Sequence, residues 1–299
     1  MASPRAIKAA VVQAGSVLFD TPATIGKLET LTAEAARQGA QIVVFPEAFI
    51  GGYPKGMNFG AVVGHRTPEG RTDYRRYWES AIELDGPEAT RIARAARLGG
   101  VYLVTGVIER AGGTLYCTVL FHGPDGTMLG KHRKVMPTAM ERLIWGYGDG
   151  STLTVLNTPL GNIGAVICWE NYMPMMRMAM YAKGIQIYCA PTVDDRETWP
   201  VSMRHIAFEG RCFVLSAVQF NDRIRGGSVI ANPQGFLLAG PVYGQETILT
   251  AELNMDDLPE GKYDFDAVGH YARPDLFQLH VNESPQEPVR TSSRDARDD

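Results

Sequence analysis

One cysteine in the sequence stands where a nucleophile could be held. Cys168 lies in the stretch IGAVICWENYMP, residues 163–174, between a predicted apolar strand and a helix expected to begin near Pro174. Backbone N–H groups and the positive end of a helix dipole meet at such a junction, and both favour a thiolate. Cysteine is also among the most buried residue types. The local pattern therefore fits either a nucleophile or a small core residue.

A glutamate ends a second apolar run. Glu47 follows the segment QIVVF and Pro46, and the carboxyl ends of strands are where open α/β sheets gather their ligands. A carboxylate at that edge could serve as the general base for a thiol. Lys55 is the only cation near it in the sequence, so a solvated loop carboxylate is the alternative interpretation.

A basic cluster follows a predicted hairpin. The segment GKHRKVMPT contains Lys131, His132, Arg133 and Lys134 in succession. Because side chains alternate along a strand, His132 and Lys134 should share one face, and Lys131 and Arg133 the other. One pair could point inward while the other stays solvated, and the sequence alone does not decide which.

Other motifs are absent or weak. The sequence contains no HExxH, no GxSxG and no CxxC pair, so neither a metal nor an organic cofactor is predicted. The glycine-rich segment WGYGDGS, residues 145–151, predicts a close-packed turn rather than a phosphate-binding loop. His205, on a helix expected over 199–211, could orient a thiol, but a core or interface histidine is the alternative.

The periodicity predicts an α/β protein. Helices are expected at 21–38, 86–98 and 199–211, and strands at 7–13, 41–45, 101–108, 152–156 and 162–167. The segment VLFHGPDGTMLGK predicts a hairpin. Because crossover helices and hairpins feed the same sheets, mixed sheets are expected.

Three pairs of segments resemble each other in the same order along the chain. QGAQIVVFPE resembles KGIQIYCAPT, GVYLVTGVIE resembles RCFVLSAVQF, and HGPDGTMLG resembles ANPQGFLLAG, where the members of the pairs begin at 38 and 183, 100 and 211, and 122 and 231. The echo favours two related halves, with chance similarity among strand–turn–strand segments as the alternative.

Composition limits the class of protein. The 299 residues are 45% hydrophobic and 21% charged, with a net charge of -4, which argues against a nucleic-acid-binding surface. No apolar run is long enough for a membrane span or a secretion signal. We expect a soluble cytoplasmic protein with one domain over residues 1–284 and a charged, disordered tail over 285–299.

Taken together, the motifs resemble the nitrilase superfamily, and within it the nitrilase branch. The carriers are FPE ending at Glu47, RKVMPT containing Lys134, and CWEN beginning at Cys168, in the order and at the wide separations of that family. The resemblance implies a four-layer αββα sandwich with two mixed sheets and pseudo-two-fold internal symmetry. It also implies a homo-oligomer, either a dimer or a longer spiral filament, and no metal or cofactor.

The resemblance also implies a reaction. Cys168 would be the nucleophile, Glu47 the general base and Lys134 the stabiliser of developing charge, with Glu141 as a second carboxylate. The expected activity is hydrolysis of an organic nitrile to a carboxylic acid and ammonia through a cysteine thioimidate and thioester, with amide as a possible by-product. An amidase or N-carbamoyl hydrolase using the same triad is the alternative. Four residues are candidates for substrate binding, with core packing as their alternative role: Trp169, Tyr53, Trp199 and Thr192.

One segment departs from the family pattern. Only residues 221–225, NDRIR, separate SAVQF from GGSVIANP, where nitrilases usually carry a longer segment. Either the segment is truly short or residues are missing from it. The departure puts substrate specificity and filament formation in doubt.

Overall fold

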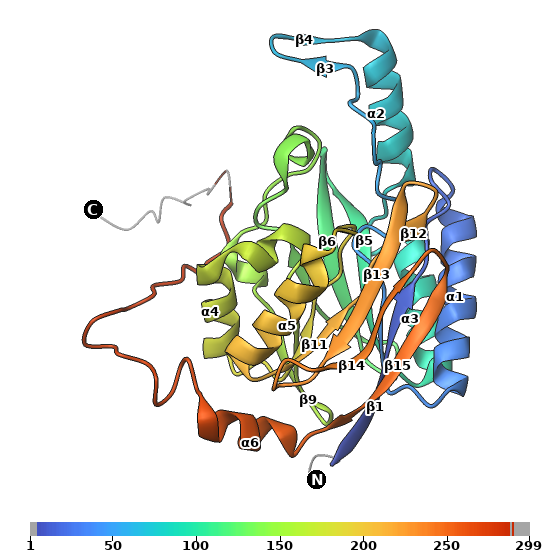
Figure 1. Cartoon of the computed structure of the whole chain (residues 1–299). Helices are drawn as coiled ribbons and strands as arrows, with labels where there is room; N and C mark the ends of the chain where they lie inside the picture. The colour runs from blue at the N-terminus through green and yellow to red at the C-terminus, as the bar shows by residue number, and fades with distance from the viewer. Residues whose placement is uncertain (1–4, 288, 290–299) are drawn as a thin grey trace, which may run out of the picture.

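Two mixed β-sheets pack face to face in the computed structural model, which describes residues 5–287 and 289 (Figure 1). The first sheet has the order β15 (Thr247–Asn254), β1 (Ala6–Gln13), β2 (Ile42–Val44), β5 (Tyr102–Ala111), β6 (Thr114–His122) and β7 (Met128–Arg133). The second has the order β12 (Phe220–Asn221), β13 (Ile224–Ala231), β11 (Phe213–Ser216), β10 (Ile187–Cys189), β9 (Gly161–Ala165) and β8 (Val155–Thr158), with β14 (Leu237–Tyr243) also paired to β13.

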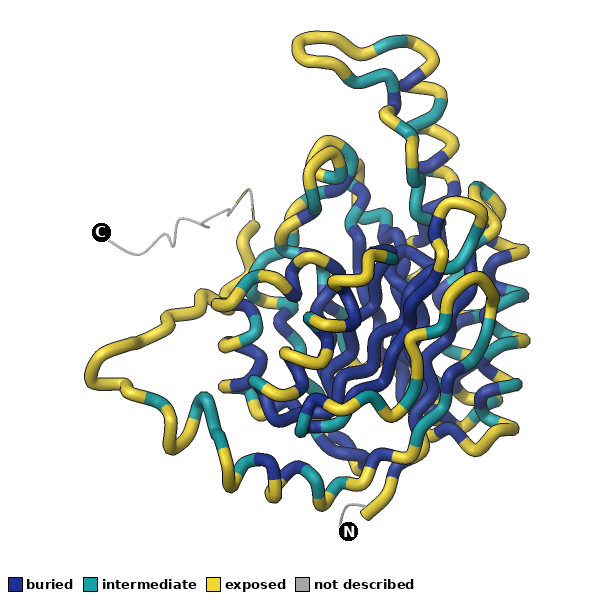
Figure 2. Tube along the Cα trace, in the orientation of Figure 1, coloured by how far each residue is buried: buried dark blue, intermediate teal, exposed yellow. Residues whose placement is uncertain are grey.

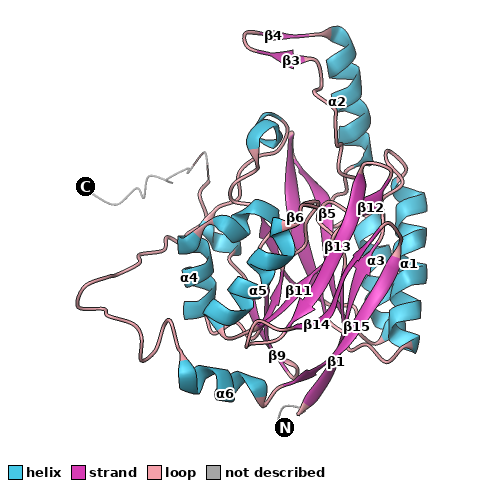
Figure 3. Ribbon diagram, in the orientation of Figure 1, coloured by secondary structure: helices cyan, strands magenta, loops and turns pink. Residues whose placement is uncertain are grey.

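The helices complete four layers (Figure 3). Helices α1 (Thr21–Arg37) and α3 (Pro87–Gly99) cover the outer face of the first sheet, and α4 (Pro174–Ala182) and α5 (Thr198–Gly210) cover that of the second. Helix α2 (Pro68–Ser80) and helix α6 (Asp257–Asp264) lie outside these layers. The predicted αββα sandwich is confirmed.

Three apolar cores hold the layers together, and Figure 2 shows the buried chain concentrated in the sheets. The central core joins the inner faces of the two sheets, for example Val11 and Val104 of the first with Phe213 of the second. The two outer cores join each sheet to its helices. The continuous apolar runs of the central strands follow from this arrangement, because each such strand is covered on both faces.

The two sheets repeat one strand order. The series β1-β2-β5-β6-β7 corresponds to β9-β10-β11-β13-β14, with the first three strands parallel in each series and the last two joined as a hairpin. The resembling segments found in the sequence fall on corresponding elements. The expected pseudo-two-fold symmetry is therefore seen in the topology.

The segment between β2 and α3 contains a feature that the sequence did not predict. Helix α2 carries a two-stranded arm, β3 (Ala61–Val62) with β4 (His65–Arg66), which projects from the body in Figure 1. Only Gly70, Tyr77 and Ser80 of α2 are buried, so the helix lacks the apolar periodicity on which prediction depends.

The short segment at 221–225 forms a tight turn. Phe220 pairs with Arg225 and Asn221 with Ile224, so the two residues between them close a hairpin. The five residues 221–225 are thus enough to connect β12 to β13 by a hairpin turn.

The chain after α6 loops away from the body without helix or strand and returns to it near α4 (Figure 1). Glu283 forms an ion pair with Lys183 at 2.8 Å, and the Gln286 N–H donates to Asp149 at 2.7 Å. Most of the predicted tail, 285–299, lies outside the described residues. Within the described part of the chain, no helix is both long and apolar enough to cross a membrane.

Candidate active site

Cys168 lies just beyond β9, at the first residue of a short 3-10 turn, Cys168–Tyr172. Its φ is +50°, a left-handed conformation that is uncommon for a residue with a side chain. The Cys168 N–H donates to the Pro191 carbonyl at 2.9 Å, which fixes the turn against the end of β10. The residue is 3% exposed, yet it lines a cavity. The thiol is therefore buried, as in the core interpretation, and also faces an open space, as a nucleophile would require.

The expected stabilisation of a thiolate by a helix dipole is wrong. Helix α4 begins at Pro174, so Cys168 does not occupy its first turn. Burial and the nearby Glu47 charge raise the pKa of the Cys168 thiol well above its ordinary value, against the opposing effect of Lys134. The Cys168 thiol is therefore neutral at rest, and it would need a base in order to act as a nucleophile.

Glu47 follows β2 and is completely buried. A Cβ at Gly106 of β5 would lie 2.1 Å from the Pro46 carbonyl oxygen and 2.8 Å from the Glu47 Cα, so a glycine is needed for this close approach. Gln219 holds the loop from the other sheet, donating to the Glu47 carbonyl at 2.7 Å. The next residue, Ala48, has a φ of +49°.

The two oxygens of Glu47 have different surroundings. Oε1 accepts from the Lys134 Nζ at 2.6 Å and lies 3.6 Å from the Cys117 sulfur, whereas Oε2 has no hydrogen-bond partner among the described residues. Burial raises the pKa of Glu47, Lys134 opposes that shift, and Glu141 adds to it; the Cys168 thiol also acts on the same carboxyl. Oε2 is thus the oxygen left open to accept a proton.

The alternation along GKHRK is confirmed and its direction is decided. His132 and Lys134 are buried, while Lys131 and Arg133 lie on the opposite face and pair with Glu109. Lys134 Nζ donates to Glu47 at 2.6 Å and to Glu141 at 2.8 Å. Although burial alone would lower it, the pKa of Lys134 is raised well above its ordinary value by Glu47 and the neighbouring thiols. Lys134 is therefore a buried cation shared by two carboxylates.

Glu141 lies on a 3-10 turn, Ala139–Leu143, that follows β7 and Lys134. Its Oε2 also accepts from the Thr138 N–H at 2.6 Å, and its Oε1 accepts from the Tyr53 hydroxyl at 2.8 Å. Ala139, which opens the turn, has a φ of +46°. The carboxylate is thus held in place by a lysine, a backbone N–H and a phenol.

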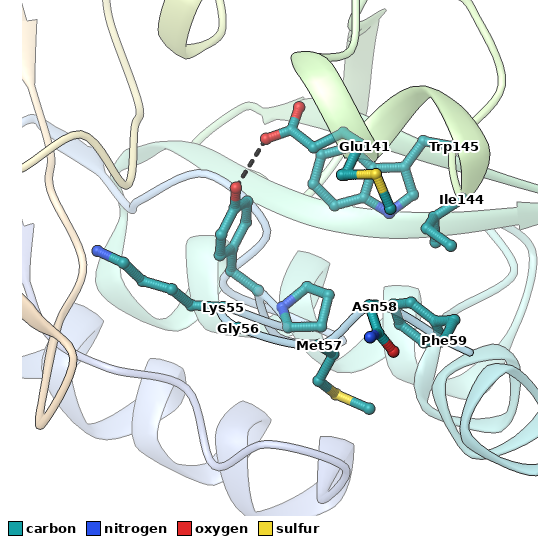
Figure 4. Close-up of a pocket in the computed structure, with 11 residues that line it drawn as sticks. Lys55, Gly56, Met57, Asn58, Phe59, Glu141, Ile144 and Trp145 are labelled. Atoms are coloured by element: carbon teal, nitrogen blue, oxygen red, sulfur yellow. Dashed lines mark hydrogen bonds between the residues drawn. The ribbon is translucent and has the colours of Figure 1, made fainter. Parts of the chain in front are cut away.

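Two cavities meet at Glu141 and Tyr53. The nucleophile cavity, about 310 Å3, is lined by Tyr53, Lys55, Thr138, Glu141, Cys168, Trp169, Val193, Asp194, Asp195 and Arg196. A side chamber of about 280 Å3 shares Tyr53, Lys55 and Glu141 with it and is otherwise mostly apolar. Figure 4 shows this side chamber, with Glu141 and Trp145 on one wall and the segment from Lys55 to Phe59 on the other. A substrate bound at Cys168 would have apolar space on the far side of the Tyr53–Glu141 pair.

The predicted substrate-binding residues occupy different surroundings. Trp169 and Tyr53 line the nucleophile cavity, and the Thr192 hydroxyl lies 3.0 Å from the Cys168 sulfur. Trp199 is fully buried in the core between α5 and the second sheet, where its indole N–H donates to Ser216 at 2.8 Å, and it does not line the cavity. The structure therefore assigns Trp199 to core packing.

Other residues near the site had no clear signal in the sequence. The Trp169 indole N–H donates to Asp194 at 2.9 Å, and the Arg196 guanidinium lies 4.6 Å from the Trp169 ring centroid. Lys55 pairs with Asp195 at 3.8 Å rather than with Glu47. Asp194, Asp195 and Arg196 follow a strand end in the same way as Glu47, which is the one feature that could have pointed to them.

Two further expectations concern the surroundings of the site. His205 lies on α5 with a largely exposed side chain, 3.6 Å from Glu209, and does not reach the thiol. In the WGYGDGS turn, a Cβ at Gly148 would lie 2.2 Å from the Arg133 carbonyl oxygen, so the predicted close packing is confirmed. Among residues 5–287, no three His, Cys, Asp or Glu side chains are arranged to bind a metal ion.

Known proteins match the chain over nearly all of its length. Residues 8–263 match the family described as carbon-nitrogen hydrolase. An aliphatic nitrilase of Sinorhizobium fredii (strain HH103) is 56% identical over 303 residues, covering 95% of this chain and 98% of that protein. A bifunctional nitrilase/nitrile hydratase of Lupinus angustifolius is 55% identical over 311 residues, covering 96% of this chain and 89% of that protein.

The fold also matches that of solved structures. The solved structure of Saccharomyces cerevisiae Nit3, a member of branch 10 of the nitrilase superfamily, matches with a TM-score of 0.74 at 22% identity, covering 90% of this chain and 97% of that one. The alignment with the lupin protein spans 311 positions although this chain has 299 residues, so that relative carries residues that are absent here. With these matches along almost the whole sequence, the chain belongs to the carbon-nitrogen hydrolase family, in its nitrilase branch.

Proposed function

We propose that the protein hydrolyses an organic nitrile to the carboxylic acid and ammonia, using Cys168 as the nucleophile. The observation that carries this proposal is that a thiol lining a cavity, Cys168, interacts with Glu47, a buried carboxyl that has one unpaired oxygen and is paired with the buried cation Lys134. Sequence identity of 50–56% with plant and bacterial nitrilases supports nitrile as the substrate class.

The first stage forms a covalent bond to the substrate. Glu47 takes the proton of the Cys168 thiol while the sulfur adds to the nitrile carbon, and it then passes this proton to the nitrile nitrogen, which gives a thioimidate and leaves Glu47 ionised for the next step. Because the thiol is neutral at rest, proton removal accompanies attack. The Glu47 Oε2, which has no partner among the described residues, is the acceptor in this step.

The second stage releases ammonia and then the acid. Water, losing a proton to Glu47, adds to the thioimidate carbon, and the carbon–nitrogen bond breaks with protonation of the leaving ammonia. A second water then adds to the resulting thioester, the carbon–sulfur bond breaks, and the acid leaves as the thiol is restored. Lys134 and the backbone N–H of Trp169, in the first turn of a 3-10 segment, stabilise the charge that develops on nitrogen and oxygen.

Glu141 and Tyr53 complete the machinery in this proposal. Glu141 accepts from Lys134 and Tyr53 on its two oxygens, so it holds the lysine in place and joins the wall between the cavities. Loss of the sulfur instead of ammonia from the first tetrahedral intermediate would release an amide. The lupin relative is named as both a nitrilase and a nitrile hydratase, which supports amide as a by-product here.

A panel of aliphatic and aromatic nitriles with the matching amides tests the proposal. Ammonia, acid and amide are each quantified for the wild-type chain and for Cys168→Ala. We expect acid and ammonia from at least one nitrile, faster than from its amide, and no turnover by the variant. Turnover of amides alone would favour an amidase, and nitrile turnover by Cys168→Ala would exclude the proposed nucleophile.

We also propose that the chain forms homo-oligomers. The support is the arm on α2, whose tip residues Val62 and Val63 are 63% and 107% exposed, because exposed apolar groups on a projecting hairpin favour contact with another subunit. Light scattering of the purified protein gives the mass, and a monomer at working concentration would contradict this proposal.

A further inference from the structure

Glu170, two residues after Cys168, is completely buried and is not part of the proposed chemistry. Its Oε1 accepts from the Val135 N–H at 2.5 Å, and its Oε2 accepts from the Ile167 N–H at 2.9 Å. Oε2 also lies 3.0 Å from the His132 Nε2. One carboxylate therefore meets three groups, two of which are backbone N–H groups.

The positions of these backbone groups matter. Val135 directly follows Lys134 at the end of the strand β7 in the first sheet, and Ile167 directly precedes Cys168 beyond β9 in the second. A single carboxylate thus joins the backbone beside the proposed nucleophile to the backbone beside the proposed cation. A shift of either strand end would break one of the two hydrogen bonds.

The protonation of His132 follows from its other contact. Its Nδ1 lies 2.9 Å from the Thr152 carbonyl oxygen, which can only accept, so Nδ1 carries a hydrogen. If Nε2 carried none, its lone pair would face the Glu170 oxygen. The contact at Nε2 therefore also holds a proton, and the pair is formally a buried imidazolium facing a carboxylate.

The groups around the pair agree with that charge state. Burial alone would lower the pKa of His132, but Glu170 raises it above the ordinary value. The other titratable groups on which Glu170 acts are Tyr188 of β10 and Cys117 of β6, and their pKa values are raised by burial, so both stay neutral. Glu170 is thus the anion that offsets the burial of the His132 imidazolium.

We infer that His132 and Glu170 form a proton-dependent clamp that positions Cys168 relative to Lys134. The inference rests on the proposed function in that it takes these two residues as nucleophile and charge stabiliser. The clamp residues are positioning residues, since neither lines the nucleophile cavity. Small displacements of reacting groups reduce turnover strongly, by about 100-fold for about 1 Å, so the effect should fall on kcat rather than KM.

Three variants separate the parts of the clamp. Glu170→Gln offers one acceptor oxygen to three donors, so at least one backbone hydrogen bond is lost. His132→Gln places an amide N–H near the position of Nε2 and keeps the contact with Glu170 without a titrating proton. His132→Asn, one methylene shorter, places its amide near Nδ1 and loses that contact. Glu29→Gln, which removes a carboxylate of α1 paired with Arg91 of α3 on the outer layer of the first sheet, is the matched control.

The measurements are kcat and KM on a nitrile turned over by the wild type, from acid to alkaline pH. We expect kcat to fall about 100-fold in Glu170→Gln and His132→Asn with KM unchanged, and to stay within about twofold in Glu29→Gln. The wild type should lose kcat as pH rises through the raised pKa of His132. His132→Gln should retain most of kcat and lack that alkaline fall.

Wild-type kcat at every pH in both Glu170→Gln and His132→Asn would overturn the inference, as would an equal fall in Glu29→Gln. If Glu170→Gln does not fold, the His132→Gln and His132→Asn pair decides, and equal kcat in those two overturns it. Alkylation of Cys168 by iodoacetamide, followed by peptide mass spectrometry, is measured without any nitrile. If alkylation is slower in Glu170→Gln but the wild-type protein turns over no nitrile, the clamp stands and the proposed function is rejected. If alkylation is unchanged in Glu170→Gln and this variant hydrolyses nitrile as fast as the wild type, the clamp alone is rejected.

Discussion

Strands β2 and β10, which occupy equivalent places in the two halves, end in the same way but with different chemistry. Each has three buried residues, followed by a further apolar residue, a proline and a buried polar side chain, which is Glu47 in the first half and Thr192 in the second. Glu47 lies against Lys134, and Thr192 donates to the Cys168 thiol at 3.0 Å. Equivalent backbone positions thus support a base on one side and a hydroxyl on the other.

The same contrast holds one strand further on. Strand β1 pairs with β2 in the register that β9 adopts with β10, so the residue corresponding to Cys168 is Ala14. Ala14 is fully buried and has no reactive group. The first half therefore supplies the charged groups and the second half the thiol. The repeat explains why these positions converge, whereas residue type alone decides what each position does.

The largest expected effect on kcat comes from replacing Cys168 by alanine, the residue at the equivalent position of the first half, Ala14. Cys168→Ala gives both halves alanine there, and kcat for nitrile hydrolysis should fall by at least about 10^4. Alanine can occupy the left-handed backbone at a similar energy to cysteine, so the thermal unfolding midpoint should change little. Ammonia release and calorimetry check the two parts. Residual turnover above about 1% would show that the second half does not supply the nucleophile.

The next largest effect on kcat is expected from removing the proposed base, Glu47, from the first half. Glu47→Gln keeps the shape but cannot accept a proton, so kcat should fall by about 10^3. In the wild type, activity requires ionised Glu47, whose pKa is raised above its ordinary 4.5. The rate should therefore fall as pH drops through a value above 4.5, and this acid limb should be missing from the residual rate of the variant. A pH profile of kcat/KM for both proteins tests this, and an unchanged limb would assign it to another group.

Removal of the cation should affect stability as well as turnover. Lys134→Met leaves the buried Glu47 and the neighbouring Glu141 without their shared lysine, so kcat should fall by about 10^2 to 10^3 and the free energy of unfolding by about 3–5 kcal/mol at neutral pH. Without the lysine, the folded-state pKa of a buried carboxyl lies above its unfolded value. The lost stability should therefore return as pH falls and the carboxyls become neutral. Urea unfolding at several pH values is the measurement, and a pH-independent loss would contradict the charge argument.

The smallest effect is expected at the counterpart of Glu47. Thr192→Val removes one hydrogen bond to the thiol, worth about 1 kcal/mol, so kcat should fall roughly fivefold. Thr192→Ser, which keeps the hydroxyl, should restore most of it. Steady-state kinetics of both variants provide the test. A fall as large as that of Glu47→Gln would mean that the two strand ends contribute equally.

The sequence predicted what depends on local pattern. The central strands, the main helices and the alternation along GKHRK were predicted, because apolar periodicity and strand geometry are local properties, but which pair of GKHRK side chains faces inward was not. The arm on α2 was missed because that helix buries only three residues. The pairing of Lys134 with Glu47, 87 residues apart, came from motif resemblance and not from physical inference.

Two expectations about the site were wrong, the thiolate at Cys168 and the pocket role of Trp199, and the role of Glu170 was left open; each depends on contacts with residues far away in the sequence. The Cys168 pKa is set by burial and by Glu47, neither of which is visible in CWEN. Glu170 could not be assigned from sequence because its partners are two backbone N–H groups and a histidine 38 residues away. Trp199 was a candidate for the pocket because a tryptophan at a helix start looks the same whether it faces a cavity or a core.

The three left-handed residues of the site carry a consequence for engineering and evolution. Cys168, Ala48 and Ala139 each adopt positive φ within two residues of a proposed catalytic side chain, at a cost of about 1–2 kcal/mol apiece. Glycine at 48 or 139 would relieve this strain and let those loops relax away from Glu47 and Glu141. Selection for heat resistance should therefore favour changes that slow the enzyme, and such a stability–activity trade-off would keep these loops less stable than the sheets that carry them.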